Sequence, residues 1–226
     1  MDKKFYKNLL KCILIIFLFF ETTKIQKLLV IIFNIKKINI TTAAILNLSS
    51  NIIFLIFILL VYRKELKKEW LIFKKDISNN LDCGIKYWLI GLVAMAISNI
   101  IIGILLGGGQ ANNEQMVHKM IKALPIFMVI NAGIIGPINE ELIFRKGFKN
   151  VFTDKWKFIL ISGIFFGLCH VTSATTLQQF LYFIPYSSLG IAFATMYYKT
   201  KTIYTSMFIH ITHNVILTLV SVLSLI

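Results

Sequence analysis

The sequence predicts an all-α integral membrane protein, a helical bundle with about six to eight transmembrane helices. Three observations predict this fold class. Hydrophobic residues make up 57% of the 226 residues and the mean hydropathy is +0.77, whereas an ordinary soluble domain is about 45–50% apolar. The apolar residues gather into runs close to the ~20 residues that cross a bilayer. The lysines and arginines gather between those runs.

Seven apolar segments follow one another along the chain. The first begins with Leu9–Phe20. It either continues to Phe33 as one long interrupted helix or is a short crossing followed by a surface helix, and both alternatives stay open. Since no small-residue cleavage site follows it, we interpret it as a retained membrane helix. The other segments cover about 41–62, 87–106, 124–145, 156–170, 177–198 and 203–225. We divide the chain into N-terminal membrane helices with a linker (residues 1–82) and a membrane-embedded core (residues 83–226).

The positive charge follows the loops. The formal net charge is +14, and the basic stretches 63–75, 146–157 and 199–201 alternate with connections that carry few Lys or Arg. The positive-inside rule therefore places the N-terminus and the basic loops in the cytoplasm of a multi-pass protein of the cell membrane. We expect the charged stretch Arg63–Asp76 to be an amphipathic linker helix on the membrane surface. No basic groove with aromatic platforms accompanies the charge, so we expect no nucleic-acid partner.

Small residues suggest where helices approach closely. Gly103 and Gly107, and likewise Gly163 and Gly167, have the four-residue spacing of close helix contacts.

The cysteines Cys12, Cys83 and Cys169 have no paired spacing, which favours buried, unreactive thiols. A polar loop is expected over 110–122.

Two adjacent glutamates mark the most informative part of the chain. Glu140, Glu141 and Arg145 end an apolar run, Leu124–Ile138, that contains no charge. Ionisable residues in a membrane segment are costly and mark a functional site by default. Glu141 and Arg145 are four residues apart on one helix face and can pair, while Glu140 points about 100° away. We therefore expect Glu140 to act as a general base, with a structural Glu–Arg clamp as the alternative.

Three further polar residues lie in later apolar segments. His170 ends one segment, and His210 and Asn214 share a face of the last. On its own, His170 fits a hydrogen-bonded core residue, and the His210–Asn214 pair fits helix packing equally well. Together with the glutamates they permit amide hydrolysis: Glu140 and His170 activate a water, and His210 and Asn214 hold the oxyanion. His213 is expected to be a spectator. The motifs HExxH and GxSxG are absent, so the rival schemes lack support.

The motifs Glu140-Glu141-x-x-x-Arg145, Phe166-x-x-x-His170 and His210-x-x-x-Asn214 resemble, in order and separation, those of the CPBP family, also called the Abi or type II CAAX endopeptidase-like family. The resemblance covers roughly residues 85–220. It implies an all-helical bundle with a membrane-embedded active-site cavity, so that residues 83–226 form an intramembrane protease core. It also assigns the same roles to the catalytic residues, with Glu141, Arg145 and Phe166 in support.

The resemblance does not imply a single cofactor requirement, because members of the family differ. Family members have been described as glutamate-dependent and as metalloproteases. We expect that the protein needs no cofactor. If the enzyme is metal-dependent, we expect Zn²⁺ to be bound by Glu140, His170 and His210. The expected partners are the lipid bilayer and a membrane-associated peptide or protein substrate. The alternatives are a non-catalytic protein of bacteriocin self-immunity or a membrane scaffold, and a proton-coupled carrier.

Overall fold

The computed structural model describes residues 3–107 and 111–224, and all the regular structure in those residues is helical. The elements are α1 (Lys3–Phe20), α2 (Thr22–Ile32), α3 (Ile40–Lys75), α4 (Ile77–Leu106), α5 (Asn112–Ala123), α6 (Pro125–Ile130), η1 (Asn131–Ile135), α7 (Gly136–Glu140), η2 (Glu141–Gly147), α8 (Phe148–Val151), α9 (Lys155–His170), α10 (Leu177–Leu181), α11 (Phe183–Thr200) and α12 (Ile203–Leu223). The predicted all-α membrane bundle is confirmed.

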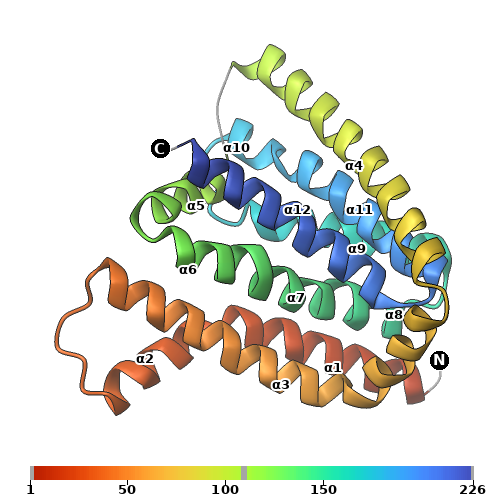
Figure 1. Cartoon of the computed structure of the whole chain (residues 1–226), viewed down its shortest axis with the longest axis horizontal. Helices are drawn as coiled ribbons and strands as arrows, with labels where there is room; N and C mark the ends of the chain where they lie inside the picture. Colours follow the sequence, from red (N-terminus) through yellow and green to blue (C-terminus); the bar gives the residue numbers. More distant parts are fainter. Residues whose placement is uncertain (1–2, 108–110, 225–226) are drawn as a thin grey trace.

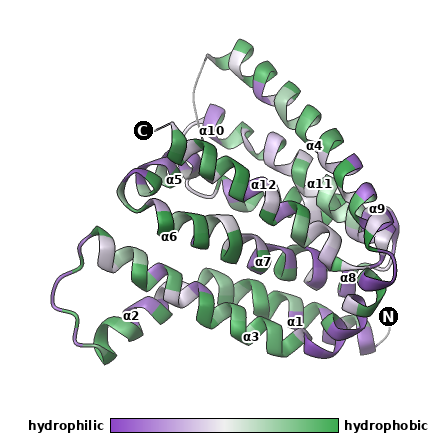
Figure 2. Ribbon diagram, in the orientation of Figure 1, coloured by the Kyte–Doolittle hydropathy of each residue, from purple (hydrophilic) through white to green (hydrophobic). Residues whose placement is uncertain are grey.

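The helices form a layered bundle (Figure 1). Helices α1, α2 and α3 lie along one side, the run from α6 to α8 lies next to them, and α12 crosses over that run. Helix α11 packs between α9 and α4, and α4 lies at the opposite edge. Hydrophilic residues gather at the end of the bundle where α3 meets α4, close to α8 and the N-terminus (Figure 2). These are the basic stretches that the sequence places in the cytoplasm.

Five helical stretches of the described residues are long and apolar enough to cross a membrane. They are Ile40–Lys75, Ile77–Leu106, Pro125–Val151, Leu177–Thr200 and Ile203–Leu223. Helices α1 and α9 are shorter, with 18 and 16 residues, and account for the difference from the six to eight predicted crossings. The protein is a multi-pass membrane protein.

The helix that carries the glutamates is irregular. Between Pro125 and Val151 the chain stays helical, but the two segments η1 and η2 are π-helical and flank the short helix α7. Pro137 lies in α7 and has no N–H to donate to the preceding turn. A π-helical turn places one extra residue in the turn and is frequent at functional sites. Glu140 is the last residue of α7 and Glu141 the first of η2, so the two glutamates lie at such a change of helical period.

Several expectations about single segments were wrong. Residues 63–75 do not form a separate surface helix: they continue α3 to Lys75, where Glu69 is buried. Most of the expected loop at 110–122 is α5, apart from Gln110, which lies outside the described residues together with Gly108 and Gly109. The first apolar segment breaks at Glu21 into α1 and α2, which decides between the two alternatives left open above.

Glycines let α9 and α11 approach closely. A Cβ added to Gly163 would lie 2.5 Å from Cγ1 of Ile191, and one added to Gly167 would lie 2.5 Å from the carbonyl oxygen of Phe183. No atom of the described residues lies within 4 Å of a Cβ added to Gly103 or Gly107. Of the two expected glycine pairs, only Gly163 and Gly167 lie at a close helix contact among the described residues. This contact holds α9, and with it the terminal His170, against α11.

One apolar core connects the two parts of the chain. Its buried residues come from α1 and α3 as well as from the later helices, and include Cys12, Tyr62, Phe144, Phe158 and Ile203. The division at residues 82 and 83 stays a prediction.

Candidate active site

Glu141 and Arg145 form a buried ion pair, as the sequence predicts. Nε of Arg145 lies 3.4 Å from Oε1 of Glu141, and both side chains are fully buried. The guanidinium group also donates from Nη1 to Oγ of Ser162 at 3.3 Å, and its Cζ lies 4.6 Å from the ring centre of Phe166. Removing one partner of such a pair leaves a buried unpaired charge, so this pair holds η2 in place against α9.

His210 lies between the two glutamates. Its Nδ1 is 3.0 Å from Oε1 of Glu141, and its Nε2 is 3.5 Å from Oε2 of Glu140. The ring stacks on Phe193, with centroids 4.4 Å apart. Because Glu141 is already paired with Arg145, it accepts the Nδ1–H of His210, and this contact orients Nε2 toward Glu140.

The contact of Glu140 with His210 is loose. At 3.5 Å it is longer than a good N–H···O hydrogen bond, and Oε2 of Glu140 is buried without a hydrogen-bond partner among the described residues. A buried polar atom of this kind calls for an explanation, such as a bound water or a catalytic role. Oε2 of Glu141 likewise has no hydrogen-bond partner among the described residues, but Glu141 is fully buried and paired with Arg145. The side chain of Glu140 is 21% exposed, so Glu140 is the glutamate that a further proton donor can reach.

His170 lies at the C-terminus of α9 with a defined tautomer. Its Nδ1 is 2.8 Å from the carbonyl oxygen of Phe166, so Nδ1 carries the proton and Nε2 of the neutral ring is an acceptor. The ring lies between Phe166 and Tyr186, with centroid distances of 4.4 and 4.5 Å. Phe166 contacts both His170 and His210, which places this predicted supporting residue between the two histidines.

Asn214 and His213 follow His210 on α12. Nδ2 of Asn214 donates to the carbonyl oxygen of Ala132 in η1 at 3.0 Å, which ties α12 to the helix of the glutamates and leaves one amide hydrogen available. Nε1–H of Trp88 donates to Nδ1 of His213 at 3.3 Å. The neutral His213 ring therefore carries its proton on Nε2. Sequence reasoning did not find the Trp88 contact, because Trp88 lies 125 residues away on α4.

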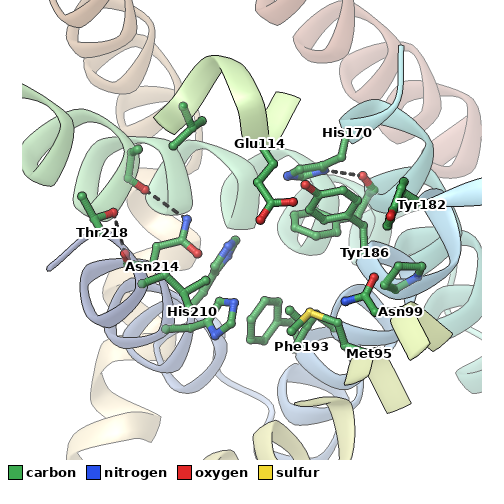
Figure 3. A pocket seen from close by; sticks show the side chains of 17 residues that line it. Met95, Asn99, Glu114, His170, Tyr182, Tyr186, Phe193, His210, Asn214 and Thr218 are labelled. Atoms are coloured by element: carbon green, nitrogen blue, oxygen red, sulfur yellow. Dashed lines mark hydrogen bonds between the residues drawn. The ribbon is translucent and has the colours of Figure 1, made fainter. Parts of the chain in front are cut away.

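A cavity of about 320 Å³ lies beside these residues (Figure 3). Its size is at the lower end of the ~300–1,000 Å³ of ligand pockets. Helices α4, α5, α9, α11 and α12 and segment η1 contribute its walls, which include His170, His210, His213 and Asn214. Glu140 does not line the cavity. It contacts His210, which does line it. The cavity extends toward α5 and α10, at the end of the bundle opposite the basic stretches.

A second buried polar cluster lies toward the basic end of the bundle, and the sequence did not predict it. Lys146 follows Arg145 and contacts Glu69 of α3 at 2.5 Å and Glu65 at 3.2 Å. Tyr197 donates to Glu69 at 2.8 Å. The other carboxylate oxygen of Glu69 accepts the backbone N–H of Ile203 at 2.8 Å, at the start of α12. Glu69 thus connects α3 with η2, which directly follows Glu140, and with α12, which carries His210 and Asn214.

A signal for this cluster exists in the sequence. The buried residues Tyr62, Leu66, Glu69 and Phe73 have the spacing of one helix face. Glu69 is the charged member of an otherwise apolar stripe, which distinguishes it from the solvated residues of the same stretch.

The residues expected for a zinc site are not gathered as a ligand set. Zinc needs three or four protein or water ligands, and no three His, Cys, Asp or Glu side chains of the described residues come together in a way that could hold a metal. In this conformation His210 directs both of its nitrogens at glutamates.

Comparisons with known proteins support the motif analysis. The family model "Type II CAAX prenyl endopeptidase Rce1-like" matches residues 122–216, which hold all the predicted site residues. "Putative membrane peptidase YdiL" of Bacillus subtilis (strain 168) is 33% identical over 125 residues, which is 54% of this chain and 47% of that protein. "Membrane-embedded CAAX protease MroQ" of Staphylococcus aureus (strain USA300) is 27% identical over 144 residues, 58% of this chain and 55% of MroQ.

A third relative, "UPF0177 protein YxdF" of Lactococcus lactis subsp. lactis (strain IL1403), is 27% identical over 172 residues, 72% of this chain and 88% of that protein. The chain spans about half the length of YdiL and MroQ. No solved structure gives a significant match. The matched region contains the three motifs in order, and these comparisons support a similarity of residues 122–216 to the CPBP (type II CAAX endopeptidase-like) family.

Proposed function

We propose that the protein is an intramembrane endopeptidase that hydrolyses a peptide bond of a membrane-associated peptide or protein. The observation that carries this proposal is the buried Oε2 of Glu140, which lies 3.5 Å from His210 and has no hydrogen-bond partner among the described residues. A water molecule that donates to this oxygen satisfies it. The same hydrogen bond makes Glu140 the general base that takes the proton when the water attacks the carbonyl carbon.

His170 is proposed to share this task. With its proton held on Nδ1 by the carbonyl oxygen of Phe166, its Nε2 lone pair can accept a second hydrogen bond from the water. A water held by two acceptors has its own lone pair directed at the substrate carbonyl, which is the orientation that attack requires. The proton taken from the water then passes to the leaving amine.

His210 and Asn214 are proposed to stabilise the oxyanion of the tetrahedral intermediate. Asn214 uses one amide hydrogen for Ala132 and keeps the second for the substrate. His210 can donate through Nε2 once that nitrogen carries a proton, while Glu141 holds Nδ1. Such donors are strong in a site that excludes water, and losing one typically costs ~10²–10³ in rate.

The comparisons support a membrane protease at the level of the family, and the names of YdiL and MroQ refer to peptidases of the membrane. The competing function is a non-catalytic immunity or scaffold protein. An observable that separates the two is turnover by the purified protein.

The test uses the full-length protein in lipid nanodiscs and a degenerate library of apolar peptides, with new termini detected by mass spectrometry. We expect cleavage by wild type and by Glu21→Gln, a control in the partly exposed ion pair with Lys24, outside the candidate site. We expect a loss of about 10²–10⁴ in rate for Glu140→Gln. Equal cleavage by Glu140→Gln contradicts the proposed role, and no cleavage by wild type favours the non-catalytic function. Treatment with a chelator is expected to leave the rate unchanged; a loss that added zinc restores would assign a metal site.

A further inference from the structure

Glu114 of α5 is an acidic residue in the wall of the cavity that no motif includes. Its carboxylate is directed into the cavity, beside Tyr186 and opposite Asn214 (Figure 3). Its contact with His118, at 3.8 Å, is long, and its side chain is 45% exposed. The carboxylate is therefore accessible to a ligand in the cavity.

The charge of the cavity contrasts with the charge of the protein. The chain has 24 Lys and Arg against 10 Asp and Glu, yet no Lys or Arg is found among the described residues that line the cavity. Glu114 is the acidic residue of this lining, and Glu140 lies behind His210. Arg145, the cation next to the site, is already paired with Glu141.

Aromatic rings surround the same space. Tyr182, Tyr186, Phe166 and Phe193 all contribute to the walls. The face of an aromatic ring attracts a cation, and a carboxylate beside such rings completes a site for an ammonium or guanidinium group. A purely apolar ligand would bury the carboxylate of Glu114 with only its long contact to His118, which is unfavourable.

We propose that Glu114, together with Tyr182 and Tyr186, forms a subsite for a cationic group of the substrate. This inference rests on the proposed function. The ring of Tyr186 stacks on His170 at a centroid distance of 4.5 Å, so a cation bound beside Tyr186 lies next to the residue proposed to activate water. The subsite thus selects peptides with a positive charge close to the scissile bond, either a Lys or Arg side chain or a free α-amino group.

The test compares the binding affinities of two peptides and does not require that either peptide is cleaved. Fluorescent, Nα-acetylated apolar peptides with one central Lys, or with norleucine in its place, are titrated onto the Glu140→Gln protein in neutral-lipid nanodiscs. Norleucine has the same chain without the amine, so the affinity ratio reports the cationic group alone. We expect the Lys peptide to bind about fivefold more tightly, a modest ratio because Glu114 is half-exposed. Adding Glu114→Gln should reduce the ratio to about one, whereas Glu114→Asp and the control Glu21→Gln should keep most of it.

A ratio that is unchanged by Glu114→Gln, or a ratio of one in the parent protein for every peptide, overturns the proposal. A third peptide with norleucine and a free amino terminus separates the two sources of the cation. Tight, Glu114-dependent binding of that peptide alone assigns the subsite to the terminus. Failure of the proposed function is recognised separately: the Glu114-dependent ratio then persists although wild type cleaves no library peptide.

Discussion

At the scale of single residues, the two adjacent glutamates have different surroundings. Glu141 contacts both Arg145 and His210 and is fully buried. Among the ion pairs of the described residues, Glu140 takes part only in the one with His210, and that contact is loose. One glutamate is therefore held in a buried ion pair, and the other is the one proposed to exchange a proton.

Glutamine substitutions should separate these roles. Glu141→Gln leaves Arg145 as a buried unpaired cation, which typically costs ~3–5 kcal/mol, so the melting temperature and the yield should both fall. Glu140→Gln should keep the melting temperature within about a degree or two and lose cleavage. The measurement pairs thermal unfolding in detergent with peptide cleavage for both variants. A stable, inactive Glu141→Gln with an active Glu140→Gln would reverse the assignment.

Residue-level sequence reasoning succeeded where a charge is isolated in an apolar run. Glu141 and Arg145 pair as their spacing predicts because a buried charge in a membrane helix needs a nearby partner. The same reasoning missed Glu69, because the apolar stripe that contains it was not followed, and Lys146, which lies among other charged residues. Nothing local distinguishes Lys146 from Lys149. The contacts of His210 with both glutamates depend on the approach of α12 to η2, which a single sequence does not specify.

Glu69 and Glu65 offer a matched test of that missed cluster. Both are on α3 and contact Lys146, but the side chain of Glu65 is 40% exposed and that of Glu69 is 11% exposed. Glu69 also accepts the N–H of Ile203. Glu69→Gln should therefore lower the melting temperature strongly, and Glu65→Gln only slightly because solvent screens its charge. Equal melting temperatures for the two variants would show that the cluster does not hold α3 to the core.

At the scale of elements, the packing of α9 on α11 positions His170. Both expected glycine pairs have the same four-residue spacing, but the structure brings a neighbouring helix against Gly163 and Gly167 and leaves Gly103 open. Spacing alone predicts which residues permit close approach; it does not say which face of a helix meets a partner. For the same reason the charge-rich end of α3 could not be distinguished from a surface helix.

Alanine substitutions at these glycines should give opposite results. Gly167→Ala places a Cβ 2.5 Å from the backbone oxygen of Phe183, which cannot move without separating α9 from α11, so stability and cleavage should both fall. Gly103→Ala meets nothing within 4 Å, and alanine is the better helix former by ~1 kcal/mol. Thermal unfolding and cleavage of the two variants check this. A neutral Gly167→Ala would mean that α9 can shift without affecting His170.

At the scale of the whole molecule, the hydrophilic end of the bundle and the cavity lie at opposite ends. The basic stretches gather where α3 meets α4, near α8 (Figure 2), while α5 and α10 cover the other end beside the cavity. The positive-inside rule places the basic end in the cytoplasm. The end of α5 then faces away from the cytoplasm, and we expect the proposed peptide substrate to reach Glu114 from that side of the membrane.

Cysteine labelling tests this orientation directly. In a background with Cys12, Cys83 and Cys169 replaced by alanine, Met116→Cys on α5 and Lys68→Cys on α3 each provide one exposed thiol, since both positions are exposed. A membrane-impermeant maleimide should label Met116→Cys in intact cells, because the basic stretches hold the opposite end in the cytoplasm. Lys68→Cys should react only after permeabilisation. The reversed pattern would place the cavity mouth, and with it the substrate's cationic group, on the cytoplasmic side. Lys36, Lys37, Lys119 and Lys122 lie toward the α5 end and oppose the expected orientation, so this result measures whether the larger basic cluster at the other end decides the topology.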